Sequence, residues 1–193
     1  MSRKEPSDRQ YWDARYAAQE PEHHAQPTPF VASCLPQLPR RGYALDVAAG
    51  TGRNSAALAA HGLWVEAVDV SAPGLHRALQ LARRRQVTIQ PIVLDLTRNW
   101  LPLRRYDVVV NSFFLMRELI PAIKQALKPG GWVVFETFTL AQYEISPQRV
   151  RSREHLLKPG ELSQLFGDFL TISYWEGVEG DRATARLLAR KPD

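Results

Sequence analysis

The sequence has one cysteine, Cys34, among its 193 residues. A single cysteine excludes an internal disulfide and a zinc site built from cysteines, so nothing in the sequence indicates an oxidising compartment. No run of 18 apolar residues occurs, and residues 1–6 lack the apolar segment of a signal peptide. We therefore expect a soluble, cytoplasmic protein that does not enter a membrane.

The chain also lacks a large excess of charge of either sign. It carries 25 Lys and Arg against 20 Asp and Glu, and its 45% of hydrophobic residues excludes a disordered or low-complexity protein. A net charge of +5 permits nucleic-acid binding but does not require it. The length predicts a single domain over residues 1–193, with the proline-rich residues 1–40 as an N-terminal helical cap and residues 41–193 as the core.

From residue 43 onward, apolar runs of strand length alternate with helical patterns, which is typical of a mainly parallel α/β sheet. Only residues 176–181 separate the last two runs, which is too short for a parallel crossover and predicts an antiparallel hairpin. The predicted fold is therefore α/β and Rossmann-like: a seven-stranded, mostly parallel sheet with helices on both faces and a C-terminal antiparallel β-hairpin. We expect strands at 43–48, 64–70, 88–94, 106–110, 132–137, 169–175 and 182–190, and helices at 8–19, 29–38, 53–61, 72–82, 119–127 and 161–166.

Small and acidic residues follow the first three predicted strands, where parallel sheets bind ligands. Gly50 and Gly52 allow close approach of a ligand to the backbone, and Asp69, 23 residues after Asp46, has the spacing of a carboxylate that binds a ribose. Asp95 could accept a hydrogen bond from an adenine amine. Each residue also has a structural explanation, as a turn or a helix cap, but Ser71 already caps the helix after Asp69. Together these strand ends predict an adenosine-binding site.

The glycine turn does not have the pattern of a dinucleotide dehydrogenase. In Gly50-Thr51-Gly52-Arg53-Asn54-Ser55 the third glycine of G-x-G-x-x-G is missing.

The segment LDVAAGTGR (45–53) resembles motif I of class I S-adenosylmethionine-dependent methyltransferases. Asp69, Asp95 and LKPGGW (127–132) match later landmarks of that superfamily, and the resemblance covers residues 43–193. YWDARY (11–16) and LLKPGEL (156–162) are similar to small bacterial methyltransferases related to the tellurite-resistance group. The loop 176–181 is shorter than in that group and has no histidine, which argues against tellurite as the substrate.

The resemblance implies S-adenosyl-L-methionine as cosubstrate, with no metal. In this interpretation the glycine turn faces the methionine and ribose portions, Ala48 replaces the usual first glycine, and Asp46 orders the turn or meets the methionine amine through water. Trp12 and Arg15 could cover the donor, although aromatic residues at helical spacing also serve as core. The implied donor-binding residues are Trp12, Arg15, Asp46, Ala48, Gly50, Gly52, Asp69, Val70, Asp95, Leu96 and Asn111.

Methyl transfer from a sulfonium needs alignment more than a dedicated base, so soft or anionic acceptors are compatible with a site that lacks one. The candidate catalytic residues are Asn111, near the transferred methyl, Arg117, as a partner for an anionic acceptor, and Tyr143, as a base or a substrate contact. Glu136 is a further candidate for a base, whereas Arg117 could equally pair with Glu118. No metal site is expected, because His23 and His24 lack metal-ligand spacing.

The predicted function is methyl transfer from S-adenosylmethionine to a small-molecule acceptor. One alternative is an RNA methyltransferase, favoured by the arginines at 149–153 but lacking a Pro-Pro-aromatic turn after the fourth strand. Another is a non-catalytic S-adenosylmethionine-binding partner subunit, and a third is a nicotinamide dehydrogenase. The oligomeric state is not indicated by the sequence.

Overall fold

The computed structural model describes residues 7–18, 25–98, 101–150 and 152–193. The histidines considered for metal binding, His23 and His24, lie outside these ranges, as does Arg151. Within the described ranges, no helix has the length and apolar character needed to cross a bilayer.

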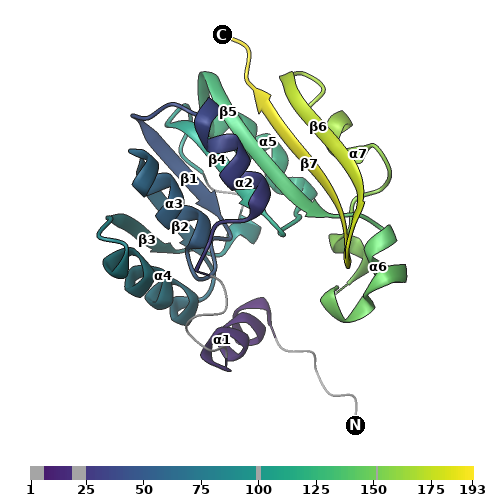
Figure 1. Ribbon diagram of the computed structural model, residues 1–193, viewed down its shortest axis with the longest axis horizontal. Helices are drawn as coiled ribbons and strands as arrows, with labels where there is room; N and C mark the ends of the chain where they lie inside the picture. Colours follow the sequence, from purple (N-terminus) through teal and green to yellow (C-terminus); the bar gives the residue numbers. More distant parts are fainter. Residues whose placement is uncertain (1–6, 19–24, 99–100, 151) are drawn as a thin grey trace.

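A seven-stranded sheet with the order β3-β2-β1-β4-β5-β7-β6 forms the centre of the molecule (Figure 1). Strands β1 to β5 are parallel, whereas β7 pairs antiparallel with β5 on one side and with β6 on the other. The predicted fold class is confirmed. The strands are β1 (Tyr43–Val47), β2 (Trp64–Asp69), β3 (Ile89–Val93), β4 (Tyr106–Ser112), β5 (Leu127–Phe138), β6 (Leu170–Glu179) and β7 (Arg182–Arg190).

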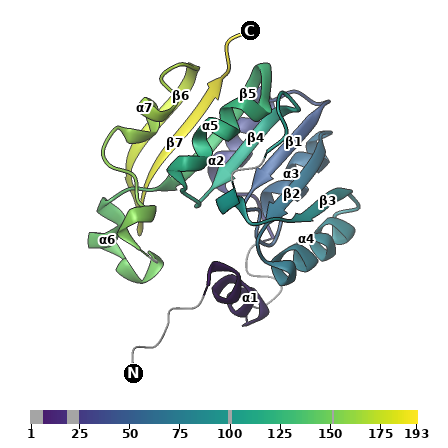
Figure 2. The ribbon, with the colours of Figure 1, turned by 180° about the vertical axis from the view of Figure 1, so that it is seen from behind.

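Helices cover both faces of the sheet. Figure 1 shows α2, α3 and α4 in front of it, and the view from behind in Figure 2 shows α5 and α7 on the other side. The helices are α1 (Asp8–Ala18), α2 (Pro29–Cys34), α3 (Arg53–His61), α4 (Ala72–Arg84), α5 (Ile120–Ala126), α6 (Ala141–Ile145) and α7 (Glu161–Leu165). Single 3-10 turns occur at Leu35–Gln37, Leu96–Arg98, Arg117–Leu119, Pro147–Arg149 and Arg153–His155.

The sheet separates two hydrophobic clusters because successive side chains of a strand point to opposite faces. In β4, Val109 belongs to the cluster under α5 and α7, whereas Val108 and Val110 belong to the cluster under α2, α3 and α4. Both faces of the central strands are therefore apolar, and the polar residues of these strands concentrate at their carboxyl ends.

Local signals in the sequence explain where helix α4 begins and helix α3 ends. The Ser71 side chain accepts a hydrogen bond from the Gly74 amide at the start of α4. Gly62 ends α3 with a φ of 116°, a conformation that glycine adopts without strain.

The N-terminal region is not one cap. Helix α1 lies beyond the sheet and packs against α4 (Figure 1). Helix α2, by contrast, contributes Val31 and Cys34 to the core on one face of the sheet. Helix α2 therefore belongs to the layer that covers this face of the sheet, where it contacts β5, whereas α1 lies outside that layer.

The C-terminal part differs from the sequence prediction in three details. Strand β5 begins at Leu127, before the expected start at residue 132, and β6 extends to Glu179, which leaves only residues 180–181 as the hairpin turn. Strand β7 is buried on both faces. Helix α6 and the turns around it were not predicted.

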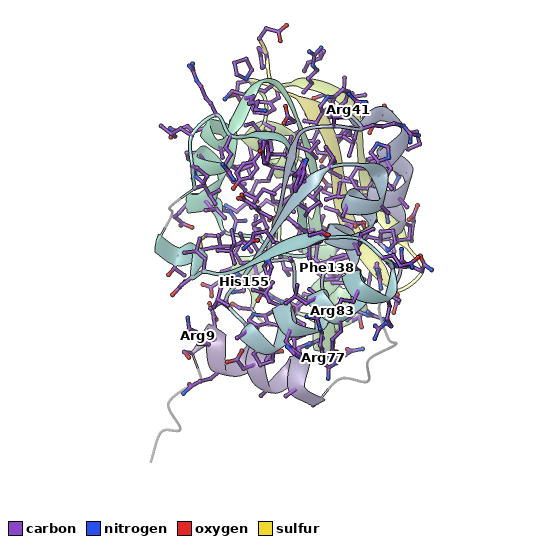
Figure 3. The ribbon with its side chains drawn as sticks, turned by 90° about the vertical axis from the view of Figure 1, so that its left-hand side faces the viewer. Arg9, Arg41, Arg77, Arg83, Phe138 and His155 are labelled. Carbon is purple, nitrogen blue, oxygen red and sulfur yellow. The ribbon has the colours of Figure 1, made fainter. Side chains whose placement is uncertain are left out.

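The basic side chains are distributed over several parts of the surface. Figure 3 shows Arg9 on α1, Arg77 and Arg83 on α4, and Arg41 at the opposite end of the molecule from α1. Arg83 lies in the last turn of α4, where a cation favours the helix dipole without any ligand.

Candidate functional site

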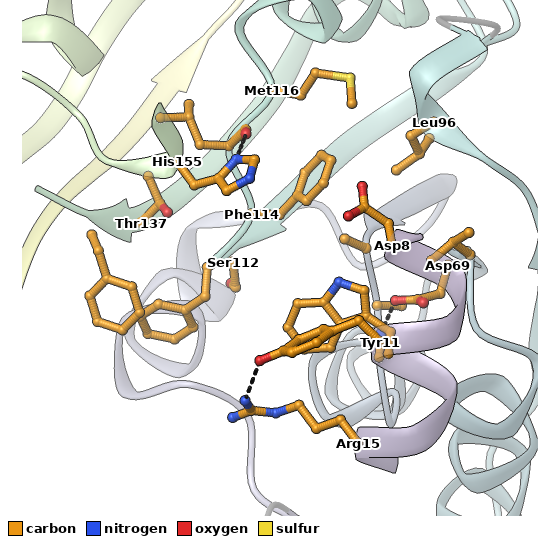
Figure 4. A pocket seen from close by; sticks show the side chains of 18 of the residues that line it. Asp8, Tyr11, Arg15, Asp69, Leu96, Ser112, Phe114, Met116, Thr137 and His155 are labelled. Atoms are coloured by element: carbon orange, nitrogen blue, oxygen red, sulfur yellow. Dashed lines mark hydrogen bonds between the residues drawn. The ribbon is translucent and has the colours of Figure 1, made fainter. Parts of the chain in front are cut away.

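A cavity of about 400 Å³ lies at the carboxyl ends of β1 to β5, between the sheet and α1. Figure 4 shows Asp8, Tyr11 and Arg15 of α1 on one side of it and Phe114, Met116 and His155 on the other. The structure brings together at this cavity most of the residues predicted to bind the donor: Trp12, Arg15, Asp46, Ala48, Gly50, Asp69, Val70, Asp95 and Leu96. Gly52 and Asn111, from the same prediction, are not among the lining residues that the structure describes.

The turn after β1 is held open toward the cavity by Asp69. Its two carboxylate oxygens accept hydrogen bonds of 2.8 Å from the amides of Gly50 and Ser71. Ala48 and Gly50 both have a φ in the left-handed region, at 52° and 55°. Asp69 therefore has a structural role that the Ser71 cap does not replace. It accepts hydrogen bonds from the backbone amides that follow two neighbouring strands, β1 and β2. Burial raises the pKa of its carboxyl.

Gly52 has a packing role rather than a place in the cavity lining. Its φ is 73°, and a Cβ added there would lie 2.4 Å from the Cβ of Ala78 on α4. The second glycine thus permits the close approach of α3 and α4, which are the helices that flank the turn.

Asp46 is a buried carboxyl at the end of β1. Its carboxylate accepts a 2.6 Å hydrogen bond from the Ser55 hydroxyl on α3, and its side chain is 1% exposed. Burial raises its pKa to about 6, although the bond from Ser55 opposes that shift. Asp46 therefore contacts α3 instead of the glycine turn itself.

Asp95 and Leu96 lie at the end of β3, on the other side of β2 from the glycine turn. Asp95 accepts hydrogen bonds from the Thr97 amide, at 3.0 Å, and the Thr97 hydroxyl, at 2.7 Å. These bonds fix the carboxylate at the cavity edge and begin the 3-10 turn that follows.

Helix α1 carries an aromatic pair over the glycine turn. The rings of Trp12 and Tyr16 stack with centroids 5.5 Å apart, and the Arg15 guanidinium lies 5.5 Å from the Trp12 ring. A Cβ added to Gly50 would lie 2.6 Å from the Tyr16 hydroxyl, so this glycine admits the α1 side chain. Arg15 also donates to the Tyr11 hydroxyl at 3.2 Å (Figure 4).

Asn111 supports the segment that follows β4. Its amide nitrogen donates a 2.7 Å hydrogen bond to the carbonyl of Phe114, and its Oδ1 is buried without a partner among the described residues. Between them, Phe113 has a φ of 58°, which is rare for a large side chain. Asn111 thus positions the Phe113–Phe114 turn rather than lining the cavity.

The structure does not bring Arg117 or Tyr143 to the cavity. The Arg117 guanidinium forms hydrogen bonds of 2.6 and 2.8 Å with Glu161 on α7, and others to the carbonyls of residues 154 and 156. Glu161 raises the pKa of Arg117 in return. The predicted contact of Arg117 with an acceptor is corrected accordingly, because Glu161 already neutralises this cation. Tyr143 is 39% exposed on α6, with Arg153 over its ring.

Glu136, the further candidate for a base, is 2% exposed and pairs with Arg186 at 3.0 Å. His155 also lines the cavity, with Nδ1 3.3 Å from the Leu115 carbonyl oxygen (Figure 4).

Sequence reasoning missed two arginines in the cavity lining, Arg53 and Arg182, and the aromatic residue Phe138 beside them. Arg53 directly follows the glycine turn, a position that could have drawn attention to it. Arg182 begins β7, and no local signal places it near the ends of β1 and β4.

Comparison with known proteins agrees with the motif. Residues 44–131 match the family model described as a methyltransferase domain. This part of the chain is therefore similar to a methyltransferase domain. A curated relative, the demethylmenaquinone methyltransferase of Tropheryma whipplei, is 32% identical over 110 residues, which are 53% of this chain. The match spans 44% of that relative's length.

Two solved structures illustrate the likeness in fold. The N-methyltransferase NodS from Bradyrhizobium japonicum in complex with S-adenosyl-l-homocysteine has a TM-score of 0.71 at 20% identity, over 96% of this chain and 98% of that one. TehB from Haemophilus influenzae has a TM-score of 0.70 at 20% identity, over 95% of this chain and 66% of that one.

Proposed function

We propose that this methyltransferase domain transfers a methyl group from S-adenosylmethionine to a small-molecule acceptor. The observation that carries the proposal is the cavity at the strand ends, where Asp69 fixes the glycine turn and Asp95 lies one strand further along the same edge.

The lining residues fit the chemistry of this donor. Each Asp69 oxygen accepts one amide hydrogen bond, and a carboxylate oxygen has a second lone pair that a ribose hydroxyl could use. Asp95 and Leu96 offer a carboxylate and an apolar contact for an adenine ring. Trp12 and Arg15 would cover the donor from α1, with Val70 and Ala48 beside the turn.

When bound, S-adenosylmethionine supplies a methyl group on a positively charged sulfur, which is already activated for displacement. The task of the chain is to align the acceptor in line with that bond and to exclude water. The segment after β4 suits this task, since Phe113, Phe114, Leu115 and Met116 all line the cavity. Asn111 holds this segment in place from behind.

A small acceptor fits the size of the site. A volume of about 400 Å³ lies at the low end of the range of small-molecule pockets, and the donor would take a share of it. Arg9, Arg41, Arg77 and Arg83 lie on different parts of the surface (Figure 3), so these four residues do not form one basic face for an RNA substrate.

Isothermal titration calorimetry with S-adenosylmethionine, S-adenosylhomocysteine and NAD tests the proposal. We expect micromolar binding of the two adenosyl ligands and none of NAD. Absence of binding by both adenosyl ligands contradicts the proposal. Binding without turnover on thiols, chalcogen oxyanions and small carboxylates, together with a stable stoichiometric partner, would favour a non-catalytic subunit instead.

A further inference from the structure

Two arginines meet one aromatic ring at the sheet side of the cavity. The guanidinium carbons of Arg53, at the start of α3, and Arg182, at the start of β7, lie 5.7 and 5.5 Å from the centre of the Phe113 ring. The Phe138 ring packs against that ring at a tilt of 36°, with centroids 4.8 Å apart, and takes up part of its surface. Three elements distant in the sequence therefore place two cations in one part of the cavity lining.

Neither cation has an ion pair with a residue that the structure describes. Neighbouring arginines do have one: Arg186 pairs with Glu136 and Glu179, and Arg149 pairs with Asp181. Arg53 and Arg182 are half-buried, and the described residues supply neither of them with a carboxylate partner.

The charged groups around Arg53 leave its positive charge only partly balanced. Burial lowers its pKa, Arg182 lowers it further by repulsion, and the carboxylates of Glu136 and Asp46 act in the opposite direction. Glu136 is already bound to Arg186, and Asp46 is bound to Ser55. Arg182 repels Arg53 in a partly desolvated site, and a bound anion would offset this repulsion.

The position of the Phe113 ring, which both arginines approach, is set by the backbone. Phe113 has a left-handed φ of 58°, and its amide donates a 2.7 Å hydrogen bond to the carbonyl of Glu136 on β5. A large residue adopts this conformation only where the surrounding structure imposes it. The aromatic surface and the two guanidinium groups are thus prepared before any acceptor binds.

We propose that Arg53 and Arg182 bind a carboxylate group of the methyl acceptor, with the adjacent part of that molecule against Phe113 and Phe138. The planar fork of a guanidinium matches a carboxylate, and the aromatic wall suits an apolar or aromatic body. A single negative charge is favoured over a dianion, because Glu136 and Asp46 already offset part of the positive charge. Calling this molecule the acceptor rests on the proposed function, whereas its binding does not.

Calorimetry with a panel of carboxylates tests the proposal in the presence and absence of saturating S-adenosylhomocysteine. The probes are benzoate, phenylacetate and butyrate, each with its neutral amide, and phenyl phosphate as a dianion. The chain should bind at least one carboxylate ten or more times as tightly as its amide. Arg53→Gln and Arg182→Gln should each weaken that carboxylate at least fivefold and leave the weak amide affinity unchanged.

Arg83→Gln on α4 is the matched control, because it removes the same charge away from the cavity and should change carboxylate affinity less than twofold. Melting temperatures identify a variant that fails to fold. If one of Arg53→Gln and Arg182→Gln does not fold, the carboxylate affinity of the other variant tests the proposal. No carboxylate preference in any pair overturns the proposal, as does a preference that survives both substitutions. If phenyl phosphate binds more tightly than every carboxylate, the site prefers a dianionic group and the proposal of a carboxylate is overturned.

The controls also separate this proposal from the proposed function. If S-adenosylhomocysteine binds and no carboxylate does, the anion site is wrong and methyl transfer stands. If carboxylates bind and neither adenosyl ligand does, the anion site stands and the proposed function falls.

Discussion

The Asp13 carboxylate on α1 accepts a 2.6 Å hydrogen bond from the Ser71 hydroxyl, the same hydroxyl that caps α4. One serine therefore joins the helix that covers the cavity to the helix that follows Asp69. This contact connects residues 58 positions apart in the sequence and fixes where Trp12 and Arg15 stand over the glycine turn.

Asp13→Ala should loosen α1 and leave α4 capped, because Ser71 keeps its bond to the Gly74 amide. We expect faster hydrogen exchange over residues 8–18 with little change over residues 72–84, and several-fold weaker S-adenosylhomocysteine binding. Ser71→Ala is the comparison, since it removes the cap as well and should cost about 1 kcal/mol of stability. Equal exchange of α1 in Asp13→Ala and the wild type would contradict a tethering role.

Asp69→Asn should weaken S-adenosylhomocysteine at least tenfold, because the uncharged amide loses charge-assisted bonds to the ribose. Asp69→Asn should also cost about 1 kcal/mol of stability, because its amide nitrogen cannot accept from one of the two backbone amides, whereas Asp69→Ala should cost about 2 kcal/mol, because both the Gly50 and the Ser71 amide lose their acceptor. Calorimetry and urea unfolding on both variants separate the two roles. Unchanged affinity in both would refute Asp69 as a donor ligand.

Asp46 should make the protein less stable as the pH rises through the acid range. Its folded pKa of about 6 lies above that of an unfolded aspartate, so the folded state holds the proton more tightly. The free energy of unfolding should fall between about pH 4 and about pH 6, by on the order of 3 kcal/mol from this residue alone.

Asp46→Asn removes this titration while keeping an acceptor for the Ser55 hydroxyl. Urea unfolding at pH 4 and pH 8 should show the variant gaining stability on the wild type at the higher pH. Asp193→Asn, at an exposed carboxylate, is the control and should follow the wild type at both values. A constant difference between Asp46→Asn and the wild type would show that Asp46 does not hold a proton in this range.

Arg117→Ala should lower stability by about 1 to 2 kcal/mol without changing donor affinity, because Arg117 binds Glu161 of α7 and donates directly to the carbonyls of residues 154 and 156. A double-mutant cycle with Glu161→Ala should give a favourable coupling of about 1 kcal/mol in urea unfolding. Lost turnover with stability and coupling unaffected would instead restore the catalytic role expected from the sequence.

Gly52→Ala should be far more damaging than Gly180→Ala. Both glycines have a left-handed φ, of 73° and 59°, but an added Cβ meets Ala78 at 2.4 Å in the first case and nothing within 4 Å in the second. We expect a loss of about 1 kcal/mol for Gly180→Ala from backbone strain alone and at least about 3 kcal/mol for Gly52→Ala. Similar losses in denaturant unfolding would show that α3 and α4 can move apart.

The sequence by itself determined the sheet and the polar strand ends. Helix α3 begins and ends where Gly52 and Gly62 predict, and Ser71 caps α4, because these signals act over three or four residues. Residues placed at parallel strand ends converge whatever the details of packing, which is why Asp69 and Asp95 were found at the cavity.

The tertiary structure alone decided what each polar group meets. Glu161 lies 44 positions from Arg117 and takes this cation away from the cavity, whereas Arg182 arrives at Phe113 through the antiparallel insertion of β7 between β5 and β6. Pairings of this kind depend on strand order and on helix packing over long sequence distances. No local pattern of residue types encodes them, so the sequence predicted where a ligand would bind better than which arginines would bind it.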